Sequence, residues 1–302
     1  MGFVCIEQAM HAILMFRRLV SILLLASFSL LTGCSAVRVV YNQADTVLAW
    51  MAHDYFDLDP AQKHEFNKRI DTLLAWHRQE QLPDYARFLG EMKQRAQRNI
   101  TRDDALWLIE GTKSRFRVIA EKGTPDAVDL LATLTSDNIH ALEKEFAKVN
   151  QKFTREYKLG GTQEDRRRAR LDRTLKRIRD WTGPLTHAQE ERIAVLNNNI
   201  PYTDHLRQQE RQRRQKEFLA LLATRNNKAE FARALRPWLA DWEKGRAPDV
   251  HAAIDDSYEK RITLSLEVQH MLTPQQRAHV QEKLQGYIED LNALAAKRVA
   301  TN

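Results

Sequence analysis

The sequence predicts an all-α fold, either an antiparallel helical bundle or an elongated helical array. Glycine and proline are scarce, with 10 and 8 in 302 residues, while long stretches are rich in helix-forming residues. Apolar residues recur at steps of three and four, and several segments open with a helix-capping pattern. With 43% hydrophobic residues, the composition favours a packed core over a disordered chain.

The first element is a bacterial lipoprotein signal peptide, expected over residues 1–33. Two arginines precede an apolar run, and Leu-Thr-Gly then leads into Cys34, the cysteine that such signals lipidate. The run is shorter than the roughly 20 residues that a membrane-spanning helix needs, so cleavage is favoured over a retained anchor. A complete signal could start at Met15, which indicates that residues 1–14 are an over-extended start site.

Lipidation at Cys34 would tie the mature chain to a membrane. The next residue is Ser35, whereas in bacterial lipoproteins an aspartate there favours the inner membrane. The resemblance therefore implies an outer-membrane lipoprotein that faces the periplasm. Cys5 is lost with the signal, which leaves no second thiol for a disulfide or a cysteine metal site. The expected partners are the membrane, through the lipid, and an envelope protein.

Helices are expected along the rest of the chain. Residues 37–41 alternate apolar and polar side chains and are expected to form an extended tether. Apolar residues then recur at helical spacing in five stretches: 44–55, 66–74, 106–134, 218–222 and 280–294. Glycine and proline predict breaks in the chain at 123–125, 160–161 and 245–248.

Four helix starts share one pattern: leucine, then threonine or aspartate, two residues, then glutamine or asparagine. The threonine or aspartate oxygen can accept the amide of the third helical residue, while the amide side chain reaches back, which forms a capping box. Four ordinary helix starts would give the same pattern. The residues are Leu58, Asp59 and Gln62; Leu134, Thr135 and Asn138; Leu185, Thr186 and Gln189; and Leu272, Thr273 and Gln276.

This pattern resembles the Leu-Thr-x-x-Gln motif of the Spy and CpxP group of periplasmic chaperones and stress regulators. The copies at Leu185 and Leu272 match it fully, while Asp59 and Asn138 depart from it in the other two. The overall layout is similar to a family of uncharacterised Gram-negative helical lipoproteins. The resemblance implies an envelope protein that binds unfolded or acidic polypeptide.

The spacing of the four copies suggests an internal duplication, with halves 34–160 and 161–302. The two copies start 76 residues apart in the first half and 87 residues apart in the second. A single irregular helical domain with coincidental caps would explain the spacing equally well.

A basic run is the strongest electrostatic feature of a chain whose net charge is +7. A helix would turn about four times over this run, so its charges cannot share one face. We expect a solvated surface, with contact to anionic headgroups or acidic clients as alternatives. The export signal argues against nucleic acid as a partner. The run comprises Arg166, Arg167, Arg168, Arg170, Arg173, Lys176, Arg177 and Arg179.

The sequence lacks the motifs of the common enzyme classes, namely a Gly-rich phosphate loop, G-x-S-x-G and H-E-x-x-H. Two groups have metal-ligand residue types at close spacing, but local charge pairing is the favoured interpretation. We therefore expect no catalytic residue, cofactor or metal, and a non-enzymatic interaction protein. A structural or assembly factor docked to one envelope partner is the alternative. The two groups are His251, Asp255 and Glu259, and His53, Asp54 and Asp57.

Overall fold

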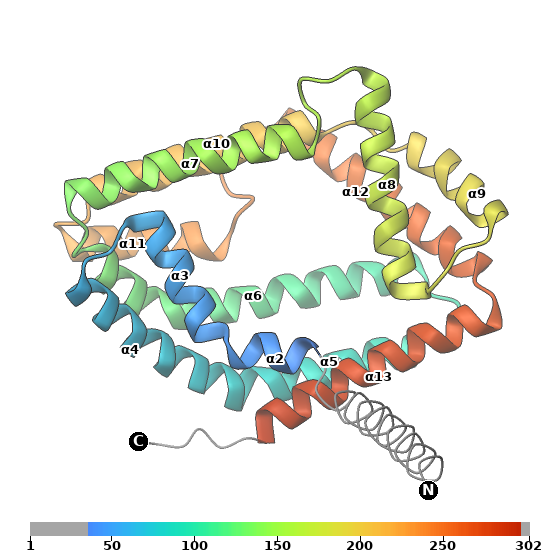
Figure 1. Ribbon diagram of the computed structural model, residues 1–302, viewed down its shortest axis with the longest axis horizontal. Helices are drawn as coiled ribbons and strands as arrows, with labels where there is room; N and C mark the ends of the chain where they lie inside the picture. The colour runs from blue at the N-terminus through green and yellow to red at the C-terminus, as the bar shows by residue number, and fades with distance from the viewer. Residues whose placement is uncertain (1–35, 297–302) are drawn as a thin grey trace, which may run out of the picture. The chain divides into compact units, whose positions relative to one another are not determined.

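The computed structural model describes residues 36–296 (Figure 1). Every regular element in this part of the chain is helical, which confirms the predicted all-α class. Within the same residues, no helix has the length and apolarity needed to cross a bilayer. The signal peptide and Cys34 lie outside the described residues. The described residues fall into two units, which divide between Ala44 and Asp45.

The first unit contains one described helix, α2 (Ala36–Asn42). We expected residues 37–41 to be an extended tether, and this prediction is wrong. Alternation over five residues is a weak signal, because valine is less favourable in a helix than alanine by only about 0.7 kcal/mol or less.

The second unit is built from helices joined by short connections, and its first helix begins at the boundary between the two units. Breaks lie between α7 and α8 and between α11 and α12, which confirms the breaks predicted at 160–161 and 245–248. In chain order the elements are α3 (Ala44–Phe56), α4 (Pro60–Trp76), the π-helical turn η2 (His77–Gln81), α5 (Leu82–Arg95), α6 (Arg102–Leu131), α7 (Ser136–Glu156), α8 (Gln163–Thr182), α9 (His187–Asn198), α10 (Asp204–Ala223), α11 (Lys228–Ala240), α12 (Pro248–Met271) and α13 (Pro274–Ala296).

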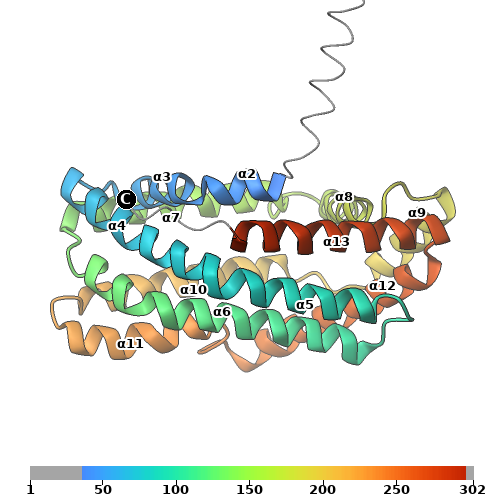
Figure 2. The ribbon, with the colours of Figure 1, turned by 90° about the horizontal axis from the view of Figure 1, so that it is seen from below.

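The break predicted at 123–125 is wrong, because α6 runs through Pro125. The hydroxyl of Thr124 donates to the carbonyl of Ala120 at 2.6 Å, inside the helix. Val128 is buried one turn later, where α6 packs along α11 (Figure 2). Tertiary packing therefore outweighs the unfavourable effect of an internal proline, which is about 3 kcal/mol.

Helices from the two predicted halves pack on one another within the second unit. α5 lies along α13, α6 along α11, and α7 against α10. α8 contacts both α9 and α13, and α9 contacts α12. The division into duplicated halves 34–160 and 161–302 stays a prediction.

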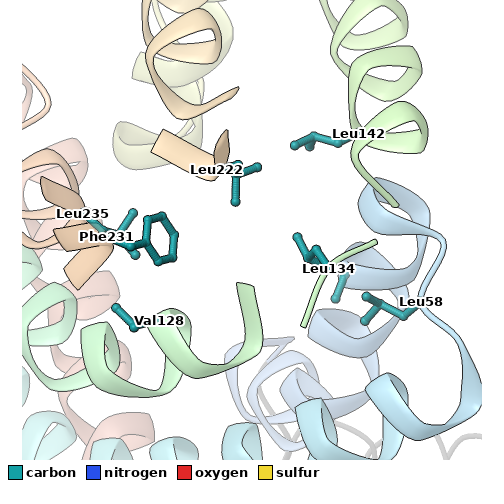
Figure 3. Close-up of a cluster of buried hydrophobic side chains, with 8 residues drawn as sticks. Leu58, Val128, Leu134, Leu142, Leu222, Phe231 and Leu235 are labelled. Carbon is teal, nitrogen blue, oxygen red and sulfur yellow. The ribbon is translucent and has the colours of Figure 1, made fainter. Parts of the chain in front are cut away.

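Among the described residues of the second unit, buried apolar side chains form two clusters. The larger joins α3, α6, α7, α10 and α11, and Figure 3 shows its leucines and Phe231. The smaller joins α8, α9 and α12 around Ile193. Each cluster borders two motif copies, because Leu58 and Leu134 belong to the larger one, while Leu185 and Leu272 pack against the smaller one.

Candidate functional site

Each of the four motif copies forms a capping box. At the start of α4, Asp59 accepts the amide of Gln62 at 2.8 Å, and the Gln62 side chain accepts the amide of Asp59 at 3.0 Å. The same two hydrogen bonds, 2.9 to 3.3 Å long, start α7, α9 and α13. Pro60 and Pro274 occupy the first helical position, where a missing N–H is tolerated.

The copies also meet in pairs, a contact that the sequence pattern did not predict. Gln62 at the start of α4 and Asn138 at the start of α7 form what we call the first cap pair. The Gln62 Nε2 donates to Asn138 Oδ1 at 3.0 Å and to the carbonyl of Thr133 at 3.1 Å. The Asn138 Nδ2 donates to the carbonyls of Phe56 and Asp57, at 2.7 and 3.1 Å.

Gln189 at the start of α9 and Gln276 at the start of α13 form the second cap pair. Each Nε2 donates to the Oε1 of the other glutamine, at 2.8 and 3.0 Å. The Gln189 Nε2 also donates to the carbonyl of Met271 at 2.8 Å, and the Gln276 Nε2 to that of Pro184 at 2.7 Å.

One geometric rule relates the two cap pairs. Every motif amide donates to the carbonyl that lies two residues before the capping residue of its partner copy. Asn138, Gln189 and Gln276 are buried, and Gln62 is half-buried. The motif amides therefore join distant helix starts through hydrogen bonds within the protein.

Two further capping boxes escaped the sequence pattern, because it required leucine and a side-chain amide. Thr101 with Asp104 starts α6, and Thr162 with Asp165 starts α8. Threonine with an acidic residue three positions later was the available signal. Asp104 is buried, and hydrogen bonds from Arg98, the Thr101 amide and Arg95 hold the pKa of its carboxyl well below its usual range.

The members of the basic run of α8 differ in burial. Arg166, Arg170 and Arg173 point inward and donate to backbone carbonyls at 2.7, 2.7 and 3.1 Å. Arg170 is buried, although we expected a solvated surface for the run. The remaining members are exposed, namely Arg167, Arg168, Lys176, Arg177 and Arg179. Arg179 donates to Glu190.

Five of the six residues considered as metal ligands form ion pairs, and Asp54 is exposed. His251 lies 3.2 Å from Asp255, while Glu259 accepts two hydrogen bonds from Arg102, at 2.7 and 3.0 Å. The bond from Arg102 holds the pKa of Glu259 below its usual value. His53 lies 3.9 Å from the carboxylate of Asp57. Across residues 36–296, no group of three His, Cys, Asp or Glu side chains is arranged to hold a metal ion.

Large apolar side chains are exposed together on one side of α3. Val47, Trp50 and Met51 follow i, i+3, i+4 spacing, and 42%, 69% and 51% of their respective surfaces are exposed. The opposite side of α3 contributes Ala52 and Phe56 to the larger apolar cluster. We call the three exposed residues the α3 apolar face. Other large apolar residues exposed in the described part of the second unit lie on α6, α9 and α12.

Comparisons with known proteins provide a family but no function. No curated protein matches the chain, and no solved structure does. The model of a family of unknown function (DUF6279) matches residues 54–251, which include three of the four motif copies and the basic run. The resemblance to the Spy and CpxP group stays a prediction. Because the match spans more than half of the 302 residues, the chain belongs to this family of unknown function.

Proposed function

We propose that this protein is a non-enzymatic interaction protein of the cell envelope, lipid-anchored at Cys34 and facing the periplasm. It docks on a specific envelope partner through the α3 apolar face. That face is the observation that carries the proposal. Tryptophan and methionine are enriched at protein interfaces, and tryptophan is enriched among residues that dominate binding energy. Isolated exposed apolar residues are ordinary on protein surfaces, but three adjacent ones on one helix are a compact docking patch.

A specific partner is better supported than a broad range of unfolded clients. A general chaperone needs an extended surface of exposed apolar side chains. Among the described residues, α6, α9 and α12 expose as large apolar side chains only Phe116, Val118, Val195 and Tyr258. The amides that carry the likeness to the chaperone group are hydrogen-bonded within the cap pairs. Because these amides are buried or half-buried, we infer that their role is structural.

The proposed anchor has a direct test. Cys34→Ser should abolish incorporation of radioactive palmitate and release the protein from the membrane fraction, because the mature chain has no other thiol. Cys5→Ser is the control and should leave labelling unchanged. Palmitate that persists in the Cys34 variant would rule out this anchor.

The docking surface can be tested by photo-crosslinking in living cells. We would place a photoreactive amino acid at Trp50 of the full-length protein and, as a control, at Val195, which is 55% exposed on α9. A specific partner predicts one discrete protein adduct from position 50 and none from position 195. A smear of many sizes would support the chaperone alternative, and an adduct to lipid alone would make the α3 apolar face a membrane contact.

A second variant tests whether formation of the adduct depends on the apolar side chains of the α3 apolar face. With the photoreactive residue at position 47, Met51→Asp should remove the adduct, because a carboxylate would be desolvated at the interface. Thr46→Asp introduces the same charge at an exposed neighbouring position and should leave the adduct in place. Equal loss from both variants would contradict docking through this face.

A further inference from the structure

A cavity of about 160 Å³ lies between α8, α10 and α12. It is unusual in its charge, because a single carboxylate, Asp204, faces five guanidinium groups. We call it the arginine cavity, after the residues that line it: Arg170, Arg173, Arg177, Arg207 and Arg261. α8 supplies three of these residues, and α10 and α12 supply one each.

The positive charge of the arginine cavity is only partly balanced by the protein. Asp204 lies 3.6 Å from the guanidinium of Arg173 and 3.6 Å from that of Arg207. Within the described residues, Arg170, Arg177 and Arg261 have no carboxylate within 4.0 Å. Five positive charges thus face one negative charge, which leaves an excess of positive charge around the cavity.

Burial makes this excess charge unfavourable in the protein alone. Arg170 is only 8% exposed, and its Nε is a buried donor without a hydrogen-bond partner among the described residues. Within residues 36–296, the guanidinium of Arg261 makes one hydrogen bond, 3.4 Å long, to the hydroxyl of Ser257. Burial and repulsion from neighbouring arginines lower the pKa of both guanidinium groups. A buried charge is stabilised when an opposite charge and hydrogen-bond acceptors are supplied to it.

Other groups around the arginine cavity also favour an anion. Thr203 and Asp204 place the amino end of α10 at its wall, and Thr203 makes no side-chain cap hydrogen bond there. The amino end of a helix carries partial positive charge and unsatisfied N–H groups. Ser257 and Tyr258 add hydroxyls, and Tyr258 is half exposed, so the cavity is accessible from solvent.

We propose that the arginine cavity binds a phosphate group, either free or carried on a lipid headgroup. A phosphate monoester brings a charge of about −1.5 to −2 and three acceptor oxygens, whereas a carboxylate brings one charge. The planar fork of arginine matches phosphate oxygens with two parallel hydrogen bonds. The cavity holds roughly ten times the 10–15 Å³ that one water needs, so a phosphate group fits. Asp204 keeps Arg173 and Arg207 in place beside the ligand.

The binding experiment uses the full-length protein in a non-ionic detergent. Sodium phosphate, acetate and chloride are titrated at equal ionic strength while the thermal unfolding temperature is recorded. Binding to the folded state predicts that phosphate raises this temperature in a concentration-dependent manner and that acetate and chloride do not. Equal effects of phosphate and acetate would overturn the proposal.

Variants locate the binding in the arginine cavity. Arg261→Gln should weaken phosphate binding about tenfold or more, as expected for the loss of a charged hydrogen bond. Arg177→Gln tests the same site from an exposed position, so the experiment holds even if the Arg261 variant unfolds. Arg168→Gln, on the outer face of α8, is the matched control and should bind within about twofold of the original protein. If Arg168→Gln weakened binding as much as Arg177→Gln, general charge attraction would replace the proposed site.

Soluble ligands distinguish the source of the phosphate. Short-chain phosphatidic acid that binds more tightly than inorganic phosphate would identify a lipid headgroup, and equal affinity would identify the phosphate group itself. Short-chain phosphatidylcholine is the control lipid. Binding of polyglutamate in preference to phosphate would overturn the proposal in favour of an acidic polypeptide. Trp50→Ala, on the α3 apolar face, should leave phosphate binding unchanged, so the two proposals can fail separately.

Discussion

The two cap pairs each hold together two helix starts that are distant in the sequence, but they use different side chains. The second pair uses two glutamines, and each amide donates to the other. The first pair combines glutamine with asparagine, and only the glutamine donates across to the other amide. The Asn138 Nδ2 instead reaches two backbone carbonyls, those of Phe56 and Asp57. The shorter side chain therefore changes the hydrogen-bond pattern and keeps the same two helix starts together.

The difference shows which part of the motif the fold requires. Both pairs keep the capping box and the bond to the carbonyl two residues before the partner's cap. The bond between the two amides varies. Asp59 and Asn138 depart from the Leu-Thr-x-x-Gln pattern, yet their caps are complete. We expect the second pair to contribute more to stability, since both of its amides are buried while Gln62 is half-buried.

The largest expected effect comes from removing an amide of the second pair. Gln276→Ala removes the hydrogen-bond partner of the Thr273 amide and of the Pro184 carbonyl, and it removes one acceptor of the Gln189 side chain. It should therefore lower the free energy of unfolding by about 2–4 kcal/mol. Gln62→Ala in the first pair should lower it by about 1 kcal/mol. Chemical denaturation measures both, and Gln275→Ala, an exposed neighbour, is the control. Equal losses from the Gln275 and Gln276 variants would remove the structural role of the pair.

The capping box that starts α6 differs from the cap pairs, because it contains a carboxylate, Asp104, that is bound by two arginines. Asp104→Asn should lower the free energy of unfolding by about 1–3 kcal/mol at pH 7, because its bonds to Arg95 and Arg98 are charge-assisted. The folded-state pKa of Asp104 is lowered, so this stabilisation is complete above the unfolded value near 3.9 and is lost as pH falls below it.

Denaturation midpoints between pH 7 and pH 3 check this second prediction. The difference between the Asp104→Asn variant and the original protein should shrink toward the acid end. Asp103→Asn changes an exposed neighbour and should have little effect throughout. A difference that stays constant down to pH 3 would contradict the charged cap.

The capping hydroxyls are expected to contribute less than the paired amides. Thr186→Ala and Thr273→Ala should each lower the free energy of unfolding by about 0.5–2 kcal/mol, because each hydroxyl accepts one helix amide. Thr186→Ser and Thr273→Ser keep that acceptor and should recover most of the loss. If neither alanine variant shifted the midpoint, these hydroxyls would have no role in starting α9 and α13.

The smallest effect is expected from making the first copy match the motif. Asp59→Thr replaces one capping oxygen with another at an exposed position, so the free energy of unfolding should change by less than about 0.5 kcal/mol. Asp59→Ala removes the oxygen and should cost more. A large loss from the threonine variant would mean that the first cap depends on a carboxylate.

Local patterns were sufficient to predict the helical class and the four helix starts that carry the motif. A capping box joins residues three apart, and an apolar stripe repeats within a few turns, so both can be recognised from a short segment of sequence. The pairing of Gln62 with Asn138 joins residues 76 apart, and nothing in either segment indicates the other. Pro125 shows the converse, because a local break signal was overridden by the packing of α6 on α11.

Which side of a helix is buried also depended on distant residues. Val47 and Met51 share the helical spacing of apolar residues found over 44–55, and they are exposed while Ala52 is buried. Arg168 and Arg170 look alike in the basic run, but only Arg170 faces the residues of α10 and α12 around the arginine cavity. The α3 apolar face and the arginine cavity therefore emerged from tertiary structure.

The cap pairs close two long loops of the chain, of 76 and 87 residues, without a covalent bond. The entropy of loop closure grows only with the logarithm of loop length, so the 11-residue difference between these loops amounts to about 0.1 kcal/mol. The chain between two paired copies can therefore gain or lose residues at its surface connections with almost no effect on the closure. Across related sequences, the distance between copies should vary more freely than the residues of the copies themselves.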